Sequence, residues 1–473
     1  MSVDHIDLLA INRGTVTAPA GCGKTHLIAQ SLKHFRGPKP ILILTHTNAG
    51  VAALRHRLNQ AGVPPRTYRL TTIDGWAMRL VGLFPQRSGV DSATLKMTNP
   101  KEDYLTVRKA AGRMLKAGDV LDPVASTYDR LIVDEYQDCS VLQHAIVFYA
   151  ARALATCVLG DPMQAIFGWP GNELADWDKH TCAHFPLQAE LSVPWRWRNA
   201  RTERLGEWLL DGRKRLQNSE AIDLTVAPEE VTWIHLDGTE DRLRQLRAGR
   251  TKAPDHEGNV LIIGKSTSPV SQQEFASQTP GAVTVEAVDL KDLVHFARDV
   301  DFQKPNALEK IANFAGSVMI NVGPADLVRR VDVLARGTAR REASDAEKAA
   351  LDFQRVRTPT AAVNLLVAIG RDAGVRSHRP AVLRACIKAL QSCDGSAGNT
   401  FHDAAIRARE QNRLIGRHLP KRAVGSTLLL KGLEADVSVI LDAADLDARN
   451  LYVAMTRGAK RLVVCSKSVV LKV

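Results

Sequence analysis

The sequence has few cysteines and lacks the patterns that would give them a structural role. Seven occur among 473 residues, and none forms a C-x-x-C pair. They stand at positions 22, 139, 157, 182, 386, 393 and 465. Because an odd, scattered set fits neither a disulfide framework nor a zinc ribbon, we expect reduced thiols. The segment His180-x-Cys182-x-His184 offers three soft ligands, but a tetrahedral zinc site needs a second pair elsewhere, so a loop is the favoured interpretation.

Long apolar runs are missing as well. Apolar stretches such as residues 41–44, and 437–441 with one serine, are far short of the roughly 18 residues that a transmembrane helix needs. The N-terminal residues 1–7 hold two acids and no basic stretch before an apolar run, unlike a secretory signal. No repeat of fixed period and no low-complexity tract is visible. We therefore expect a soluble, cytoplasmic protein without a membrane partner.

Basic residues outnumber acidic ones, and the excess is concentrated. The chain has 63 Lys and Arg against 51 Asp and Glu, a net charge of +12. Residues 324–423 contain 19 basic and 10 acidic side chains, so they hold nine of the twelve net positive charges. Solvated helix faces are one explanation. We favour a surface that faces phosphate, because such a concentration exceeds what solubility requires and is typical of nucleic-acid binding.

Short apolar strands alternate with helical patterns in two parts of the chain, which predicts parallel sheets covered by helices. Residues 14–60 read as strand, turn, helix, strand, helix, and strands recur at 130–134, 156–160, 259–263, 437–441 and 461–465. We predict an α/β fold with two tandem domains of this kind and small, mostly helical insertions. The first domain comprises residues 1–84 and 127–190, and its insertion 85–126, with one helix at 101–116. The second comprises residues 191–299 and 420–473, and its insertion, basic and mostly helical, 300–419.

The segment Ala18–Thr25 stands between a predicted strand and a predicted helix, as a phosphate-binding loop does. Gly21 and Gly23 allow backbone N–H groups to surround phosphate oxygens at a helix N-terminus. Lys24 is expected to reach the β- and γ-phosphates of ATP while the Thr25 hydroxyl binds Mg²⁺. The cysteine between the glycines reads as a small tolerated residue, with an unusually acidic thiol as the alternative. The predicted phosphate-binding residues are Gly21, Cys22, Gly23, Lys24 and Thr25.

Two acidic residues, Asp134 and Glu135, directly follow the strand at 130–133. An Asp at the end of a buried strand is costly unless it meets a cation, so Asp134 is predicted to be the outer ligand of the Mg²⁺. Glu135 is placed to orient or deprotonate the attacking water. A solvated acidic turn would not normally follow three consecutive apolar residues, 131–133.

These motifs resemble those of superfamily 1 helicases of the UvrD/Rep/PcrA type, and the resemblance extends over most of the chain. It implies that the two α/β domains are tandem RecA-like P-loop NTPase domains. Residues 134–138 are similar to the DExQD box and residues 160–169 to the GDxxQxIYxW segment, which implies that Gln164 senses the γ-phosphate. Residues 43–48 and 71–75 look like the family's DNA-contacting segments, with His46 where an aromatic is usual and Asp74 in a position often held by His. The DNA contacts implied by the resemblance are His46, Thr47, Asn48, Thr72, Phe167 and Trp169; core packing is the alternative for the last two.

The second half of the chain carries further similar motifs. Residues 191–196 resemble L-x-x-N-Y-R, which implies that Trp195 stacks on adenine and Arg196 contacts the γ-phosphate. Residues 427–434 look like T-H-x-x-K-G-L-E and place Glu434 near the nucleotide. In residues 452–457, similar to Y-V-A-x-T-R, Arg457 would be the finger between the two motor domains. The family's upstream glutamine element is absent, which puts adenine selectivity in doubt.

Two functions fit this pattern. The first is a DNA-dependent ATPase that translocates on single-stranded or partly duplex DNA, in the 3′ to 5′ direction implied by the resemblance, with weak unwinding because both insertions are short. The second is a DNA-sensing regulatory subunit that controls a partner nuclease in a hetero-oligomer. Chains of this size and loop sequence look similar to the helicase-like subunit of Gabija anti-phage systems. A P-loop protein without a DNA role conflicts with the segments at Thr47-Asn48 and Trp169.

Overall fold

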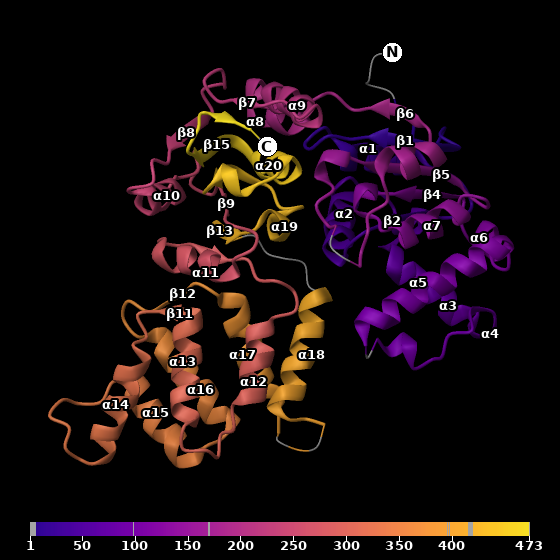
Figure 1. Cartoon of the computed structure of the whole chain (residues 1–473). Coiled ribbons are helices and arrows are strands. Elements are labelled where there is room, and N and C mark those ends of the chain that lie inside the picture. Colours follow the sequence, from indigo (N-terminus) through magenta and orange to yellow (C-terminus); the bar gives the residue numbers. More distant parts are fainter. Residues whose placement is uncertain are drawn as a thin grey trace. The chain divides into compact units, whose positions relative to one another are not determined.

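The computed structural model describes residues 6–97, 99–168, 171–394, 396, 398–414 and 420–472, with the backbone alone at 100, 101, 413 and 414. The chain forms two compact units (Figure 1). One combines residues 1–235 with 443–473, and the other comprises residues 236–442. The predicted four-part division of the chain stays a prediction.

The first unit contains a six-stranded parallel sheet in the order β3-β2-β4-β5-β1-β6. Its strands are β1 (Arg13–Thr17), β2 (Ile41–Thr45), β3 (Tyr68–Thr72), β4 (Arg130–Val133), β5 (Ala155–Gly160) and β6 (Leu187–Glu190). The apolar run at 41–44 forms a strand that is buried along its whole length, as expected where helices cover both faces of a parallel sheet. The strands predicted in this half of the chain are confirmed.

Helices pack on both faces of this sheet because successive side chains of a strand point to opposite sides. They are α1 (Lys24–His34), α2 (Asn48–Gln60), α3 (Ile73–Leu83), α5 (Pro100–Ala117) and α7 (Val141–Ala150), with short turns at η2 (Pro65–Thr67), η4 (Tyr136–Asp138) and η5 (Pro162–Gln164). Leu42 and Leu44 share a buried cluster with α3, α5 and α7. Ile41 and Ile43 share another with α1 and α2. The unit also contains α8 (Trp195–Ala200), α9 (Glu203–Gln217), β7 (Ile222–Asp223), η7 (Ala443–Asp445), α20 (Ala448–Met455) and β16 (Val470–Leu471).

The segment at 85–126 has more helix than the sequence predicted. Besides α5, it contains α4 (Pro85–Ser88), the turn η3 (Thr94–Lys96) and most of α6 (Leu121–Thr127). The expectation of a single helix is therefore wrong. Helix α6 escaped the prediction because it has only seven residues and carries Pro123, which reads as a turn signal but is tolerated in the first turn of a helix.

A second six-stranded parallel sheet has the order β10-β13-β9-β14-β15-β8. Its strands are β8 (Val231–His235), β9 (Val260–Ile263), β10 (Val283–Thr284), β13 (Arg422–Gly425), β14 (Ala435–Ile440) and β15 (Gly458–Ser466). The apolar runs at 260–263 and 437–440 form its neighbouring central strands β9 and β14. Two parallel sheets with helices confirm the predicted α/β class with tandem RecA-like domains.

The second unit is largely helical between residues 291 and 414. Its helices are α10 (Asp241–Gly249), α11 (Pro269–Gln278), α12 (Lys291–Asp299), α13 (Ala307–Val318), α14 (Pro324–Ala335), α15 (Asp345–Val356), α16 (Pro359–Arg371), α17 (Pro380–Ser392), α18 (Phe401–Leu414) and α19 (Thr427–Leu430). Helices α12 to α18 enclose one hydrophobic core. The mostly helical character predicted for 300–419 agrees with this, since β11 (Met319–Ile320) and β12 (Arg376–Ser377), an antiparallel pair, are the only strands among the described residues there. A strand of two residues is too short to show an alternating pattern in the sequence. Among the described helices, none combines the length and the apolar character needed to cross a bilayer.

The segment with His180 and Cys182 is not the predicted loop. It forms a π-helical turn, η6 (Trp177–Cys182), whose first N–H groups are capped by the Asp176 carboxylate. An N-terminal Asp stabilises such a turn, and no periodicity distinguishes it from a loop. Within the described ranges, no group of three or more His, Cys, Asp or Glu side chains could hold a metal ion. All seven cysteines are free thiols, as predicted.

Candidate functional site

The loop between β1 and α1 has the backbone of an anion site. Gly21 and Gly23 adopt φ angles of 72° and 87°, in the left-handed region that favours glycine. Gly23 is also the N-cap of α1, and no side chain caps that end of the helix. The first N–H groups of α1 are therefore available for an anion.

Two tryptophans explain why these positions exclude a side chain. A Cβ on Gly21 would lie 2.4 Å from the Trp197 ring, and one on Gly23 would lie 3.0 Å from Trp195. Trp197 is fully buried and its Nε1 donates to the Gly458 carbonyl at 3.0 Å. Trp195 is 45% exposed, so a ring face beside the loop stays accessible to a flat ligand. Trp195 was predicted from its motif, whereas Trp197 was not, because its aromatic neighbour was the only signal in the sequence.

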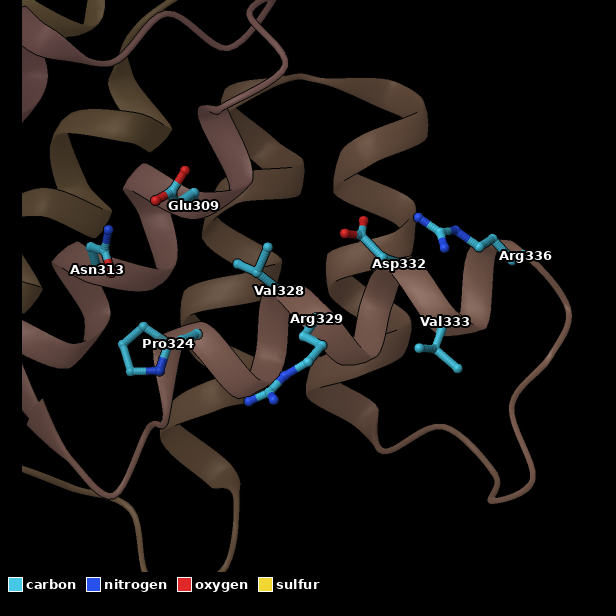
Figure 2. Close-up of a pocket in the computed structure, with 9 residues that line it drawn as sticks. Glu309, Asn313, Pro324, Val328, Arg329, Asp332, Val333 and Arg336 are labelled. Atoms are coloured by element: carbon cyan, nitrogen blue, oxygen red, sulfur yellow. The ribbon is translucent and has the colours of Figure 1, made fainter.

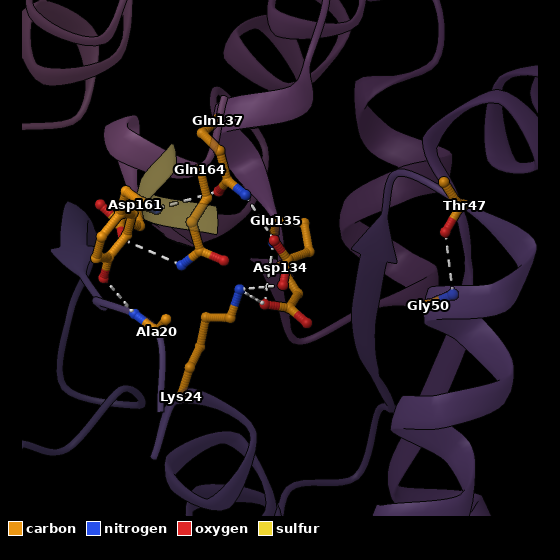
Figure 3. Close-up of polar contacts among 10 residues, drawn as sticks. Ala20, Lys24, Thr47, Gly50, Asp134, Glu135, Gln137, Asp161 and Gln164 are labelled. Carbon is orange, nitrogen blue, oxygen red and sulfur yellow. Dashed lines mark hydrogen bonds and ion pairs between the residues drawn. The ribbon is translucent and has the colours of Figure 1, made fainter. Parts of the chain in front are cut away.

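Lys24 and the carboxylates after β4 form one ionic group (Figure 3). Lys24 Nζ lies 3.0 Å from Asp134 Oδ1 and also pairs with Glu135. Burial alone would lower the pKa of Lys24, but the Asp134 and Glu135 carboxylates raise it, so the ammonium stays charged. Burial raises the pKa of Asp134, and Lys24 opposes that shift. By contrast, burial raises the pKa of Cys22 to about 12, which is opposite to the acidic thiol considered as an alternative.

Glu135 has an unusual backbone. Its φ of 55° lies in the left-handed region, which costs a non-glycine residue roughly 1–2 kcal/mol. Its Oε2 accepts from Gln137 Nε2 at 2.6 Å. Strain of this kind persists only where the surroundings impose it, and it clusters at functional sites. The sequence pattern gave no sign of this conformation.

The strand β5 lies between β1 and β4 in the sheet and contributes the next group. Gln164 Nε2 donates to Asp161 Oδ2 at 3.0 Å, and Asp161 N donates to Gln137 Oε1 at 3.1 Å. In Figure 3 the Gln164 amide lies between Asp161 and Lys24. Because β1, β4 and β5 are parallel, their carboxyl ends meet at one edge of the sheet. The predicted phosphate, Mg²⁺ and water-activating residues of these three strand ends therefore lie side by side.

Helix α20 approaches the same loop. The Tyr452 hydroxyl accepts from Ala20 N at 3.1 Å. The two arginines expected at the γ-phosphate both contact Thr456, at the end of this helix: Arg196 Nη1 donates to its carbonyl at 2.6 Å, and Arg457 Nη2 to its hydroxyl at 3.2 Å. Arg457 is only 3% exposed. Their contact with phosphate stays a prediction.

Glu434, the remaining expected nucleotide contact, belongs to the other compact unit. It is exposed, in the stretch between α19 and β14. Its place near the nucleotide also stays a prediction.

The predicted DNA-contacting hydroxyls lie after β2 and β3, which pair so that Thr45 stands beside Thr72. Thr47 caps α2 by accepting from Gly50 N at 3.0 Å, and Thr72 caps α3 by accepting from Gly75 N at 2.9 Å. Since each hydroxyl uses only its acceptor in the cap, its own hydrogen can still be donated to a phosphate. Asn48, the first residue of α2, is exposed.

Aromatic side chains of two strand ends meet next to these hydroxyls. The rings of His46 and Phe167 lie 5.2 Å apart between centroids, tilted by 52°. Phe167 is half-buried, so this pair combines packing with some accessible ring surface. Trp169, the other predicted stacking residue, lies outside the described residues.

Asp74 illustrates a departure from the family pattern that has a structural reason. Arg108 Nε and Nη2 donate to its two carboxylate oxygens, each at 2.6 Å, and Gln143 Nε2 donates to Oδ1 at 3.2 Å. This fork ties α3 to α5 and α7. The acid that replaces the usual His is therefore engaged in holding the insertion.

A cavity elsewhere is unrelated to these groups. It has a volume of about 400 Å³ and lies between α13 and α14 (Figure 2). Its lining residues are Glu309, Asn313, Pro324, Ala325, Val328, Arg329, Asp332, Val333 and Arg336. None of the predicted site residues takes part, so the phosphate chemistry is assigned to the edge of the first sheet.

Comparisons with known proteins agree with the motifs. Residues 96–180 match the family model described as the UvrD/REP helicase N-terminal domain, and this stretch contains Asp134, Glu135 and Gln164. A protein of Rickettsia conorii described as a probable DNA helicase II homolog is 26% identical over 225 residues, which are 42% of this chain and 33% of that protein. The chain thus spans about a third of the length of that relative. The resemblance to UvrD/Rep-type helicases is confirmed.

Two solved structures are similar in part. The Pif1 helicase of Candida albicans matches with a TM-score of 0.40 and 11% identity, over 97% of this chain and 92% of that one. The arterivirus nonstructural protein 10 helicase, solved with DNA, matches with a TM-score of 0.27 and 13% identity, over 53% of this chain and 47% of that one.

Proposed function

We propose that this protein is a DNA-dependent ATPase that translocates on single-stranded DNA, with ATP and Mg²⁺ as cofactors. The observation that carries the proposal is the convergence of Lys24, Asp134, Glu135 and Gln164 at one edge of a parallel sheet, beside an uncapped helix N-terminus. Each of these groups matches one requirement of phosphoryl transfer.

The residues of the site fit a nucleotide with its metal ion. The α1 N-terminus and Lys24 would hold the phosphates, and the Thr25 hydroxyl and the Asp134 carboxylate are hard oxygen ligands of the kind Mg²⁺ prefers. The ion would neutralise charge on the phosphates during transfer. Glu135 would orient or deprotonate the attacking water, and Gln164 would sense the γ-phosphate. Arg196 and Arg457 would stabilise the charge that develops there.

The DNA strand would run past the ends of β2 and β3. The hydroxyls of Thr47 and Thr72 and the exposed Asn48 support phosphate contacts there, and Phe167 with His46 supports stacking on bases. The 3′ to 5′ direction follows from the resemblance alone. A cytoplasmic location is part of the proposal.

The decisive experiment measures ATP hydrolysis by the purified chain with and without single-stranded DNA. We expect hydrolysis that requires Mg²⁺ and increases when DNA is added. Hydrolysis that DNA leaves unchanged would reject the translocase and leave only a P-loop ATPase.

The second candidate is a regulatory ATPase that licenses a partner nuclease in anti-phage defence. The concentration of 19 basic residues in 324–423 suits an acidic protein partner as well as DNA. A neighbouring gene for a nuclease, and a hetero-oligomer formed with its product in size-exclusion chromatography, would favour this candidate. Strong unwinding by the isolated chain would argue against it.

A further inference from the structure

Arg213 on α9 is a buried arginine that the motifs do not mention. It is 3% exposed. Its Nε donates to Asp161 Oδ1 at 3.0 Å, and its Nη1 donates to Glu190 Oε1 at 3.0 Å. Burial alone would lower the pKa of Arg213, but the Asp161 carboxylate raises it, so the guanidinium stays charged. A charge this deep in a protein marks a position where pairing matters.

Asp161 connects this arginine to the γ-phosphate sensor. It is fully buried, and its Oδ2 accepts from Gln164 Nε2 at 3.0 Å while Oδ1 accepts from Met163 N at 3.1 Å. An ionised carboxylate can only accept hydrogen bonds. Asp161 therefore dictates that the nitrogen of the Gln164 amide faces it. The Gln164 amide is thereby held in one of its two possible orientations.

Without Arg213, the Asp161 carboxylate would be a buried charge that has lost its ionic partner. Its orientation would then depend on the hydrogen bonds that it accepts from Met163 N and Gln164 Nε2. A small misplacement of a positioning group can cost about 100-fold in rate. Helix α9 also follows directly after α8, which carries Arg196. Consecutive helices thus contribute one arginine expected at the phosphate and another behind its sensor.

We propose that Arg213 is a positioning residue for ATP hydrolysis, which acts through Asp161 to hold the Gln164 amide in the orientation that the reaction needs. This inference rests on the proposed ATPase function. Arg213 does not touch the nucleotide in this arrangement. Its loss should therefore lower kcat without weakening ATP binding.

The test compares steady-state ATP hydrolysis of Arg213→Met with that of Arg215→Met. Arg215 is two positions along the same helix, 49% exposed and paired with Asp211, four positions before it. We expect kcat to fall about 10- to 100-fold in Arg213→Met, with KM for ATP within about threefold of the original value. Arg215→Met should match the unmodified protein in both constants.

A double-mutant cycle separates positioning from general stability. If Arg213 acts through Gln164, then Arg213→Met should cause no further loss of kcat in a Gln164→Ala background, because non-additivity reports coupling. Arg213→Lys retains a positive charge for Asp161 but lacks the guanidinium that bonds to both Asp161 and Glu190. This variant should give an intermediate kcat. If Arg213→Met does not fold, Arg213→Lys in both backgrounds answers the same question.

The outcomes of the cycle are distinct. Full additivity of the Arg213 and Gln164 changes, or equal losses in kcat and ATP binding, would overturn the inference and leave the ATPase intact. An unmodified protein that fails to hydrolyse ATP, or a Gln164→Ala variant with unchanged kcat, would instead refute the proposed use of this site, and the inference with it.

Discussion

Lys24 Nζ lies 3.0 Å from Asp134 Oδ1, a contact that joins the loop after β1 to the end of β4. Glu135 pairs with the same ammonium, so Lys24 forms ion pairs with two acids. A phosphate that arrives at the α1 N-terminus would compete with these carboxylates for Lys24. The ammonium can exchange the carboxylates for the phosphate because it forms a charge-assisted hydrogen bond with either anion.

Lys24→Ala and Glu135→Gln should separate binding from chemistry. Loss of the ammonium removes a charged hydrogen bond to phosphate, so we expect ATP affinity to fall roughly 10- to 100-fold. Glu135→Gln retains the shape of the site and removes the base, which should lower turnover about 10²–10⁴-fold with little change in affinity. Fluorescent-nucleotide binding and phosphate release measure the two effects.

The control for these variants is Glu257→Gln, since the Glu257 side chain is 84% exposed. It should behave like the unmodified protein. If Glu135→Gln hydrolyses ATP at the unmodified rate, Glu135 is not the water-activating residue.

The backbone of Glu135 makes a prediction about stability. Glu135→Gly and Glu135→Ala both remove the carboxylate, but only alanine keeps a Cβ at φ 55°. We expect the glycine variant to be about 1 kcal/mol more stable than the alanine variant, the reverse of their usual order. Chemical denaturation of both variants measures the difference. A more stable alanine variant would mean that the segment does not hold this conformation in solution.

DNA affinity should depend on salt, and Phe167 should contribute to affinity without contributing to that dependence. On single strands, log K falls by about 0.7 per contacted phosphate for each log unit of salt. Stacking adds about 1–3 kcal/mol per base and releases no counterions. Phe167→Ala should thus weaken binding by that amount at every salt concentration, measured by fluorescence anisotropy, with an unchanged slope.

Leu83→Ala is the comparison for Phe167, because Leu83 is a 62% exposed apolar side chain at the far end of α3. It should leave affinity unchanged. A flat salt profile for the unmodified protein would contradict the view that its basic excess serves nucleic acid.

His144 predicts how stability changes with pH. Burial, with smaller effects of His184 and His180, lowers its pKa from 6.5 to about 4. Between these values the unfolded chain binds a proton that the folded chain does not, so the free energy of unfolding should fall as the pH drops from 6.5 towards 4. The contribution of one such group is about 1.4 kcal/mol per pH unit. His144→Gln should remove it, as seen in denaturation midpoints at pH 7 and pH 5.

His256→Gln is the matched control, because the His256 side chain is 91% exposed. The decline with acid should persist in this variant. An identical decline in His144→Gln would show that other groups carry the pH dependence.

The basic helix α18 should matter for engagement and not for ATP binding. Charge reversal of Arg407, Arg409 and Arg413 to Glu is expected to weaken DNA or partner binding, with nucleotide affinity unchanged, because the reversed charges repel phosphate.

We also expect the isolated chain to unwind blunt duplexes feebly in a strand-displacement assay. Robust, processive unwinding would show that the helices at 85–126 grip duplex DNA better than their size suggests.

Much of the fold was predictable because it depends on local pattern. The run at 41–44 is apolar at every position, and the segment at 18–25 combines a strand end, glycines and a helix start, so each identifies its own conformation. The π-helical turn at 177–182 and the short helix α6 were not predictable, since neither has a period long enough to detect. The motif order indicated which residues belong to one site but not how they bond.

Local patterns were enough to predict the parallel sheets, the phosphate-binding loop and the carboxylates at the strand ends, because alternation, apolar runs and glycine positions act over a few residues. The pairing of Arg213 with Asp161, 52 positions away, and the hydrogen bond between Tyr452 and Ala20, 432 positions apart, are visible only in the folded chain. Such pairs carry no local signal. They form where packing removes both partners from water, since a buried charge or hydroxyl must then find a partner wherever the chain brings one.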